Sequence, residues 1–249
     1  MGLINQDTFI CLDCETTGLE TSSDQIIEIA AVRFTFDGPI DSFETLIDPL
    51  MPIPEESMAI HHITNAMVAG KPKIQEIIPQ ILSFVGKEII VGHGITHDIA
   101  FICSAAKQHN IPCKLASHPY IDTLRMARLY GESPTNSLER LRQHFNISEE
   151  GAHRAMNDVV VNIEVFKYLS KQFKTTEQLV NRLKSPIQLK TMPLGKHKSR
   201  SFSEIPIEYL RWAVNQNFDQ DLMFSLKTEL KKRKVGANFN QASNPFSNL

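Results

Sequence analysis

Residues 8–19, TFICLDCETTGL, hold the part of the sequence that decides the fold. The run begins with apolar and β-branched side chains bounded by polar ones, a pattern typical of a short buried strand. Because side chains two apart on a strand point to the same face, Asp13 and Glu15 place two carboxylates side by side at the strand end. Paired carboxylates there are costly unless they are protonated or bind a cation, and their oxygen atoms suit Mg²⁺ or Mn²⁺. We therefore interpret this stretch as a strand with a metal site rather than an exposed acidic turn.

The surrounding sequence predicts more strands and then helices. Residues 25–34 and 39–48 have strand composition and follow short turns, which predicts an antiparallel meander. After Pro54 the periods become helical, and residues 95–106 place apolar side chains along one helix face. Further short strands are predicted at 88–92 and 120–123, and helices at 74–84, 124–130, 137–145 and 153–173. Strands followed by strand–helix alternation indicate an α/β fold with a mixed sheet covered by helices.

Two further patterns carry polar groups suited to catalysis. GHGITHD, residues 92–98, ends a predicted strand at a glycine and places Asp98 in the first turn of a helix. An acid there can also simply favour the helix dipole. HRAMND, residues 153–158, holds a histidine and an acid that would lie about 140° apart on a regular helix. His153 and Asp158 can therefore share a site only if His153 lies in a loop or a frayed first turn, where it could serve as a general base.

Taken together, these patterns resemble the DEDD exonuclease family in its histidine-containing, DnaQ-like branch. The family has D-x-E on its first strand, an Asp at the start of a later helix and H-x-x-x-x-D near its end, and the resemblance runs from about Thr8 to Leu169. It implies a ribonuclease H-like fold, a mixed five-stranded sheet flanked by helices, and 3′→5′ exonuclease activity. It also implies that four carboxylates hold two divalent metal ions, Mg²⁺ or Mn²⁺, beside a histidine base. The residues concerned are Asp13, Glu15, Asp98, Asp158 and His153.

The same resemblance suggests how the 3′-terminal nucleotide is held. Thr16, Thr17 and Gly18 match the loop that meets this nucleotide, and Leu19 matches an apolar wedge against its base. The segment IHHIT, residues 60–64, resembles the family's I-H-G-I-T, so that His61 would contact the 3′ nucleotide.

Three positions depart from the family pattern. Gly94 stands where the family often has Asn, His97 where it has Phe, and His62 where it has Gly. These changes leave the carboxylates intact but bear on local packing and on the shape of the substrate cleft. We interpret His97 as a partly buried side chain rather than as an additional metal ligand.

The charge is divided unevenly along the chain. Residues 1–183 carry 15 basic and 23 acidic side chains, whereas residues 184–249 carry 11 and 5. An acidic body repels phosphate unless its carboxylates hold cations, and a basic module can supply attraction. We therefore expect an exonuclease domain over 1–183, a small basic, mainly helical module over 190–234 and a disordered tail over 235–249.

The module resembles one that follows the exonuclease domain in exodeoxyribonuclease X-like proteins. Lys196, Lys198 and Arg200 would sit on a basic turn suited to phosphate contact. Tyr209 and Trp212 are three apart on a predicted helix, and we expect them to form the small core rather than a base-stacking platform. In the tail, QASNPF at 241–246 resembles the short peptide by which proofreading subunits engage a sliding clamp; a plain disordered tail is the alternative.

These observations leave several functions open. The leading one is removal of nucleotides from single-stranded or frayed DNA 3′ ends, as a free repair nuclease or as a proofreading partner of a replicative polymerase and clamp. RNA 3′-end trimming uses the same residues, and a nucleic-acid-binding relative without activity should have lost an acid. No apolar run is long enough for a membrane span and no secretory signal is visible, so a cytoplasmic location is expected.

Overall fold

A computed structural model describes residues 2–130, 135–148 and 154–242 of the 249-residue chain, with side chains up to residue 234. The chain divides into two compact units, Met1–Leu183 and Lys184–Leu249. No helix in the described part is both long and apolar enough to cross a membrane.

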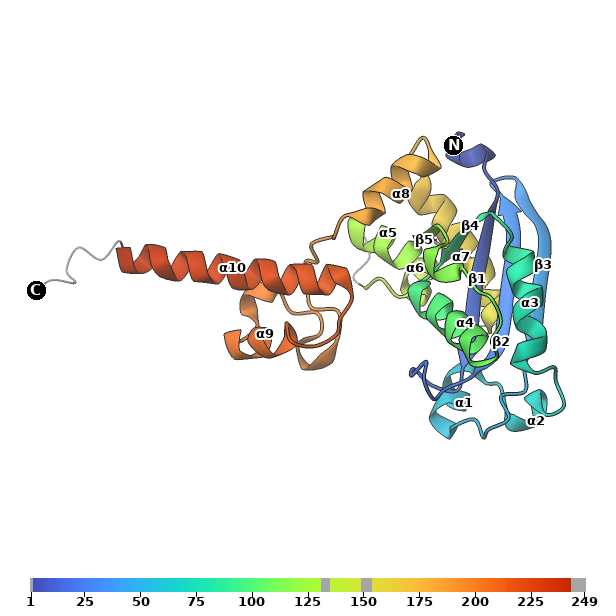
Figure 1. Cartoon of the computed structure of the whole chain (residues 1–249). Coiled ribbons are helices and arrows are strands. Elements are labelled where there is room, and N and C mark those ends of the chain that lie inside the picture. Colours follow the sequence, from blue (N-terminus) through green and yellow to red (C-terminus); the bar gives the residue numbers. More distant parts are fainter. Residues whose placement is uncertain (1, 131–134, 149–153, 243–249) are drawn as a thin grey trace, which may run out of the picture. The chain divides into compact units, whose positions relative to one another are not determined.

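The first unit is built on a mixed five-stranded sheet with strand order β3-β2-β1-β4-β5 (Figure 1). Its strands are β1 (Phe9–Thr16), β2 (Ile26–Thr35), β3 (Gly38–Leu46), β4 (Ile89–Gly92) and β5 (Tyr120–Asp122). β1 pairs antiparallel with β2 and parallel with β4. This confirms the mixed sheet of a ribonuclease H-like fold, with the long first strand at its centre.

The helices are mostly those that the periodicity predicted. Those of the first unit are α1 (Glu55–His61), α2 (Asn65–Val68), α3 (Ile74–Val85), α4 (Thr96–Gln108), α5 (Thr123–Tyr130), α6 (Leu138–His144), α7 (Ala155–Ser170) and α8 (Thr176–Lys184). The helices α1, α2 and α8 were not predicted from the sequence. The shortest of them, α2, has four residues and presents too few periodic positions to be recognised.

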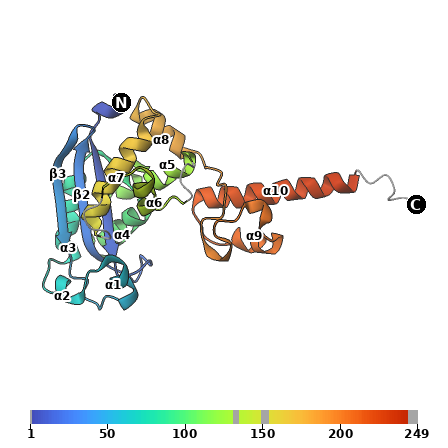
Figure 2. The same cartoon turned by 180° about the vertical axis from the view of Figure 1, so that it is seen from behind.

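The two faces of β1 lead to different layers of the protein. Ile10 and Leu12 belong to the core cluster shared with α3 and α4, which cover one face (Figure 1). The odd-numbered positions face α7, which covers the other side of the sheet (Figure 2). Phe9 meets Phe166 of α7 edge to face, with ring centroids 5.0 Å apart. Side-chain alternation therefore directs Asp13 and Glu15 toward α7, the helix that carries Asp158.

The second unit has its own small core. Short turns η3 (Gly195–His197) and η4 (Phe202–Glu204) precede α9 (Ile207–Ala213) and α10 (Gln220–Ala242). Buried apolar side chains of η4, α9, α10 and the connecting segments pack together, and Tyr209 packs against them. The buried residues are Met192, Phe202, Ile205, Leu210, Ala213, Leu222 and Leu226.

Two expectations for this unit need correction. α10 runs to Ala242, so residues 235–242 are helical where we expected a disordered tail; extending a formed helix is far less costly than starting one. Residues 243–249, with most of the clamp-like peptide, lie outside the described residues. Trp212 is 51% exposed and therefore does not form the core that was expected of it together with Tyr209.

Candidate active site

Three of the expected metal ligands meet on one face of the sheet. One carboxylate oxygen from each of Asp13, Glu15 and Asp158 lies within 4.8 Å of the other two. The first two acids project from β1, and the third projects from the first turn of α7, which packs on β1 and β2. All three side chains are half-buried, which leaves the group open to a ligand on one side. Oxygen ligands at this separation fit a divalent cation such as Mg²⁺ or Mn²⁺.

The fourth carboxylate stands beside this group. Asp98 is buried in the first turn of α4, on the side of the sheet opposite to α7. Its Oδ1 accepts a hydrogen bond from the backbone N–H of Cys14 at 2.9 Å, which ties α4 to the strand between Asp13 and Glu15. The structure thus places Asp98 next to the pair on β1 but outside the three-carboxylate group, and its role as a metal ligand stays a prediction.

Burial raises the pKa values of Asp13, Glu15 and Asp98, and neighbouring acids add to the shift. Burial, then the charges of Asp98 and Asp158, raise the pKa of Asp13 well above its ordinary value. Burial, then Asp158 and Glu28, raise the pKa of Glu15 to about 8, and burial raises the pKa of Asp98 to about 7. A cluster that resists carrying its full negative charge near neutral pH gains most when a cation neutralises it.

Sequence reasoning missed a buried ion pair beside the cluster. Glu28 on β2 is fully buried and lies opposite Glu15 in the strand register. Arg154 binds both oxygens of Glu28 through Nε at 3.1 Å and also through Nη2, and the Ala155 N–H donates to Oε2 at 3.0 Å. The pair fixes the first residues of α7, and thereby the position of Asp158. A glutamate inside the apolar run QIIEIAAV was the available signal.

The expected general base cannot be placed. α7 begins at Ala155, and Arg154 precedes it with an extended backbone. His153 lies outside the described residues. Its role as a base therefore stays a prediction.

The loop after β1 has the features expected of a nucleotide contact. Leu19 is 79% exposed, whereas Thr17 is buried and bonds the carboxylate of Asp24 at 3.0 Å. A Cβ on Gly18 would lie 2.5 Å from that same carboxylate, so glycine is required for the loop to fold this tightly. The Thr16 hydroxyl donates a hydrogen bond to the carbonyl oxygen of Gly18 at 2.6 Å. The loop is thus held from within, and it presents Leu19 to solvent.

His61 is buried at the end of α1, and its contact with the 3′ nucleotide stays a prediction. It is only 2% exposed; its Nδ1 accepts the N–H of Ile63 at 3.0 Å, and no described residue binds its buried Nε2. Burial lowers its pKa, so the neutral ring is favoured. Its neighbour His62 ends α1 with a φ of 60°, a conformation that glycine adopts more easily and that explains why the family pattern has glycine there.

The remaining departures are absorbed by local packing. Gly94 has a φ of 74°, and its N–H is held by the buried carboxylate of Asp122 at 2.9 Å. His97 packs edge-on against Phe101 with ring centroids 4.9 Å apart, and burial lowers its pKa.

Comparisons with known proteins agree with this geometry. The family model RNase_T, described as Exonuclease, matches residues 10–166. DNA polymerase III subunit epsilon of Aquifex aeolicus is 36% identical over 160 residues, which cover 64% of this chain and 78% of that protein. DNA polymerase III PolC-type of Clostridium perfringens is 33% identical over 195 residues, 76% of this chain but 13% of that much longer protein.

Solved structures show the same relationship. Exonuclease X in complex with 5′ overhanging duplex DNA aligns with a TM-score of 0.55 and 27% identity, over 70% of this chain and 98% of that chain. Escherichia coli Exonuclease I with a dA16 oligonucleotide aligns at 0.60 and 23% identity, over 72% and 43%, and shares the fold. A second family model, QSregVF_b, whose description names a quorum-sensing-regulated virulence factor, matches residues 181–230. With the carboxylates gathered on the central strand, these matches identify the chain as a member of the RNase_T exonuclease family and as a DnaQ-like 3′→5′ exonuclease of the DEDD type.

Proposed function

We propose that this protein removes nucleoside 5′-monophosphates one at a time from the 3′ end of DNA, with two divalent metal ions held by its carboxylates. The observation that carries the proposal is the convergence of Asp13, Glu15 and Asp158 within 4.8 Å on the face of the central strand. The named relatives are subunits of DNA polymerase III, and a related structure, Exonuclease X, was solved with DNA. DNA is therefore favoured over RNA as the substrate.

The carboxylates would act together as the metal site. Asp13, Glu15 and Asp158 would hold the ions, with Asp98 completing the site from α4. Such ions polarise the phosphodiester, lower the pKa of a bound water and stabilise the leaving oxygen. The Glu28–Arg154 pair would keep Asp158 in place while the charge of the site changes.

The protein's other groups would handle the proton and the nucleotide. His153, close in sequence to Asp158, would accept the proton of the attacking water, since a histidine titrates near neutrality. Leu19 would pack against the terminal base, and the backbone of the Thr16–Gly18 loop would hold its sugar. An apolar side chain of this kind contacts the face of a base and forms no hydrogen bonds with its edge. We therefore expect a preference for single-stranded or frayed ends, with little sequence selectivity.

The cellular role is narrower than the activity. The similarity to the epsilon subunit and to PolC-type polymerases favours a role beside a replicative polymerase, in proofreading or in repair. The clamp-like peptide at 241–246 would supply a contact to the sliding clamp in that setting.

Digestion of end-labelled oligomers tests the proposal. The full chain is mixed with 3′-paired DNA, 3′-unpaired DNA or RNA of the same sequence, with Mg²⁺, Mn²⁺ or EDTA. We expect ladders of one-nucleotide steps from the DNA 3′ end, fastest on the unpaired end, and none with EDTA or with Asp158→Asn. Faster digestion of RNA than of DNA would assign the enzyme to RNA trimming. If no oligomer is digested, the protein would be a nucleic-acid-binding relative without nuclease activity.

A further inference from the structure

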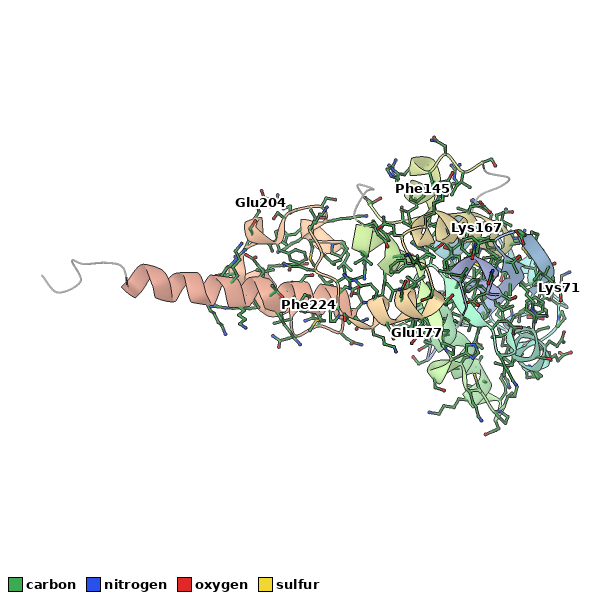
Figure 3. The ribbon with its side chains drawn as sticks, turned by 90° about the horizontal axis from the view of Figure 1, so that it is seen from above. Lys71, Phe145, Lys167, Glu177, Glu204 and Phe224 are labelled. Carbon is green, nitrogen blue, oxygen red and sulfur yellow. The ribbon has the colours of Figure 1, made fainter. Side chains whose placement is uncertain are left out.

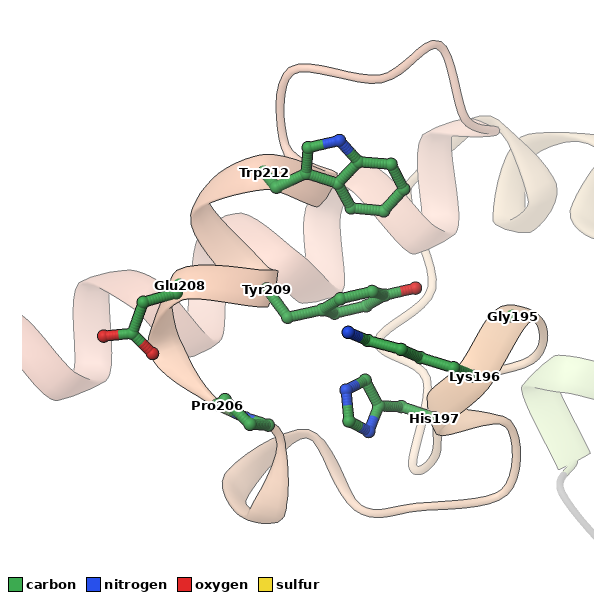
Figure 4. Close-up of a pocket in the computed structure, with 7 residues that line it drawn as sticks. All are labelled: Gly195, Lys196, His197, Pro206, Glu208, Tyr209 and Trp212. Atoms are coloured by element: carbon green, nitrogen blue, oxygen red, sulfur yellow. The ribbon is translucent and has the colours of Figure 1, made fainter.

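The second unit carries a hollow of about 640 Å³ that the nuclease reaction does not use (Figure 4). It lies between the turn η3 and helix α9, and Pro206, Glu208, Tyr209 and Trp212 line the helix side. Figure 4 shows the two aromatic rings one above the other, with Lys196 and His197 below Tyr209. Two aromatic rings and two basic side chains thus lie together on one small surface.

Trp212 provides the free aromatic surface of this hollow. The Tyr209 ring is covered on one side by Lys196, whose Nζ lies 5.1 Å from the ring centroid, and touched by His197 at 4.5 Å. Its other side meets Trp212 at 5.1 Å and a tilt of 44°. Tyr209 therefore supports Trp212, whose indole stays 51% exposed.

The positive charge of Lys196 is held beside these rings. Gly195 has a φ of 72°, and a Cβ on it would lie 2.9 Å from the Tyr209 hydroxyl, so only glycine lets the turn approach the ring this closely. Partial burial, with the charges of Arg200 and Lys196, lowers the pKa of His197. Lys196 brings a positive charge to one end of the hollow, whereas the carboxylate of Glu208 lies at the other end (Figure 4).

A second hollow of about 460 Å³ begins directly after α9. Val214 and Asn215 form one side of it, and three exposed lysines of α10 form the other: Lys227, Lys231 and Lys234. These lysines enter none of the ion pairs found among the described residues. Unpaired lysines spaced along one helix face attract a chain of negative charges rather than a single ion.

We propose that the second unit binds single-stranded DNA, with a base stacked on Trp212 and neighbouring phosphates at Lys196 and at the α10 lysines. Charge complementarity selects this occupant, because the unit carries 11 basic and 5 acidic side chains. An exposed aromatic side chain beside a basic track is the arrangement that binds single strands without reading sequence. The site goes beyond the proposed nuclease function: it is a second contact with the same class of substrate.

Trp212 is the sole tryptophan of the chain, so tryptophan fluorescence reports on the surroundings of this one side chain. The full chain is titrated in EDTA, which prevents digestion, with oligothymidylate or with polyglutamate as an acidic-peptide probe. We expect saturable quenching of Trp212 by the oligonucleotide and none by polyglutamate. Equal quenching by both would assign the surface to acidic proteins, and no quenching by the oligonucleotide would overturn the proposal.

Substitutions separate stacking from charge. In anisotropy measurements with labelled oligothymidylate, Trp212→Ala is expected to weaken binding about 5- to 100-fold with an unchanged salt dependence. Lys196→Ala should reduce the slope of log affinity against log salt by about 0.7. Lys190→Ala and Phe224→Ala serve as controls, because both side chains are exposed on the same unit and line neither hollow (Figure 3 labels Phe224). Controls that weaken binding as much as the test variants would overturn the assignment.

Failure of this proposal is distinguishable from failure of the nuclease assignment. Asp158→Asn is expected to stop digestion and leave Trp212 quenching intact, because the substitution lies in the first unit. An Asp158→Asn protein that is no longer quenched would show that Trp212 reports on DNA held at the nuclease site, and would overturn the second site.

Discussion

Arg154 binds the buried carboxylate of Glu28 through Nε and Nη2, directly before the helix that carries Asp158. The first intrahelical hydrogen bond of α7 then runs from the Asp158 N–H to the Arg154 carbonyl oxygen at 3.1 Å. One residue thus joins a buried acid on β2 to the start of the helix that supplies a proposed metal ligand. Glu28, which lies opposite Glu15 in the strand pair, is thereby linked to the position of Asp158 as well.

Arg154→Met should destabilise the protein by about 3 kcal/mol, because it leaves Glu28 buried without its counter-charge. Glu28→Gln should cost less, since an amide oxygen can still accept from Ala155. Urea unfolding measures both. Lys167→Met is the matched control: its pair with Glu164 lies on the surface of α7 (Figure 3), and its loss should change stability by no more than about 0.5 kcal/mol. Equal effects of Arg154→Met and Lys167→Met would contradict the structural role of the pair.

Asp158→Asn should separate stability from activity. The substitution removes a charge that raises the pKa of both Asp13 and Glu15, so the metal-free protein should become more stable. Each kcal/mol of relieved repulsion should raise Tm by about 2–4 °C. Digestion should fall at least about 100-fold, because the site loses one of the carboxylates proposed to hold the metal ions that stabilise the reacting phosphate. Thermal melts in EDTA and digestion in Mg²⁺ give the two readouts; a lower Tm in EDTA would show that Asp158 stabilises the fold instead.

The metal-free protein should lose stability as the pH rises from about 5 to 8. Glu15 has a folded pKa of about 8 and Asp98 of about 7, both above their ordinary values of 4.5 and 3.8. Such groups stabilise the folded state while protonated, and this contribution disappears as the pH rises through the folded pKa. Melts in EDTA across this range check the direction.

Mg²⁺ should reverse this trend. The cation binds the deprotonated carboxylates, so its stabilising effect should grow with pH and its binding should release protons. Calorimetry in two buffers of different ionisation enthalpy counts those protons at pH 7. An effect of Mg²⁺ on Tm that is equal at pH 5.5 and pH 8 would contradict the coupling.

Leu19→Ala should lower kcat/KM on unpaired DNA ends without changing Tm, because the side chain is 79% exposed and packs against little of the protein. Gly18→Ala should lower both, since the added Cβ would meet the Asp24 carboxylate at 2.5 Å and distort the loop. Steady-state digestion and thermal melts measure the two effects. An unchanged kcat/KM in the Leu19→Ala enzyme would contradict the proposed packing of Leu19 against the terminal base.

The exposure of Trp212 shows where sequence reasoning reaches its limit. Helical spacing placed Tyr209 and Trp212 on one side of a helix, and an aromatic pair at that spacing most often packs into a core. In the structure, Tyr209 packs against the core of the second unit, and the turn at Gly195 brings Lys196 over its ring. Trp212 is left half-exposed because the core of so small a unit is already filled by other side chains.

The sequence by itself determined the central strand, the order of the elements and the acids at their ends, because side-chain alternation and helical periodicity are local properties of the chain. It could not determine which acids converge. Asp13, Glu15 and Asp158 meet because all three lie on the α7 face of the sheet, whereas Asp98 approaches from the side of α4 and is held by the Cys14 N–H. That distinction, like the pairing of Glu28 with Arg154 across 126 residues, depends on which layers of the fold pack together, and only tertiary structure brings such distant segments into contact.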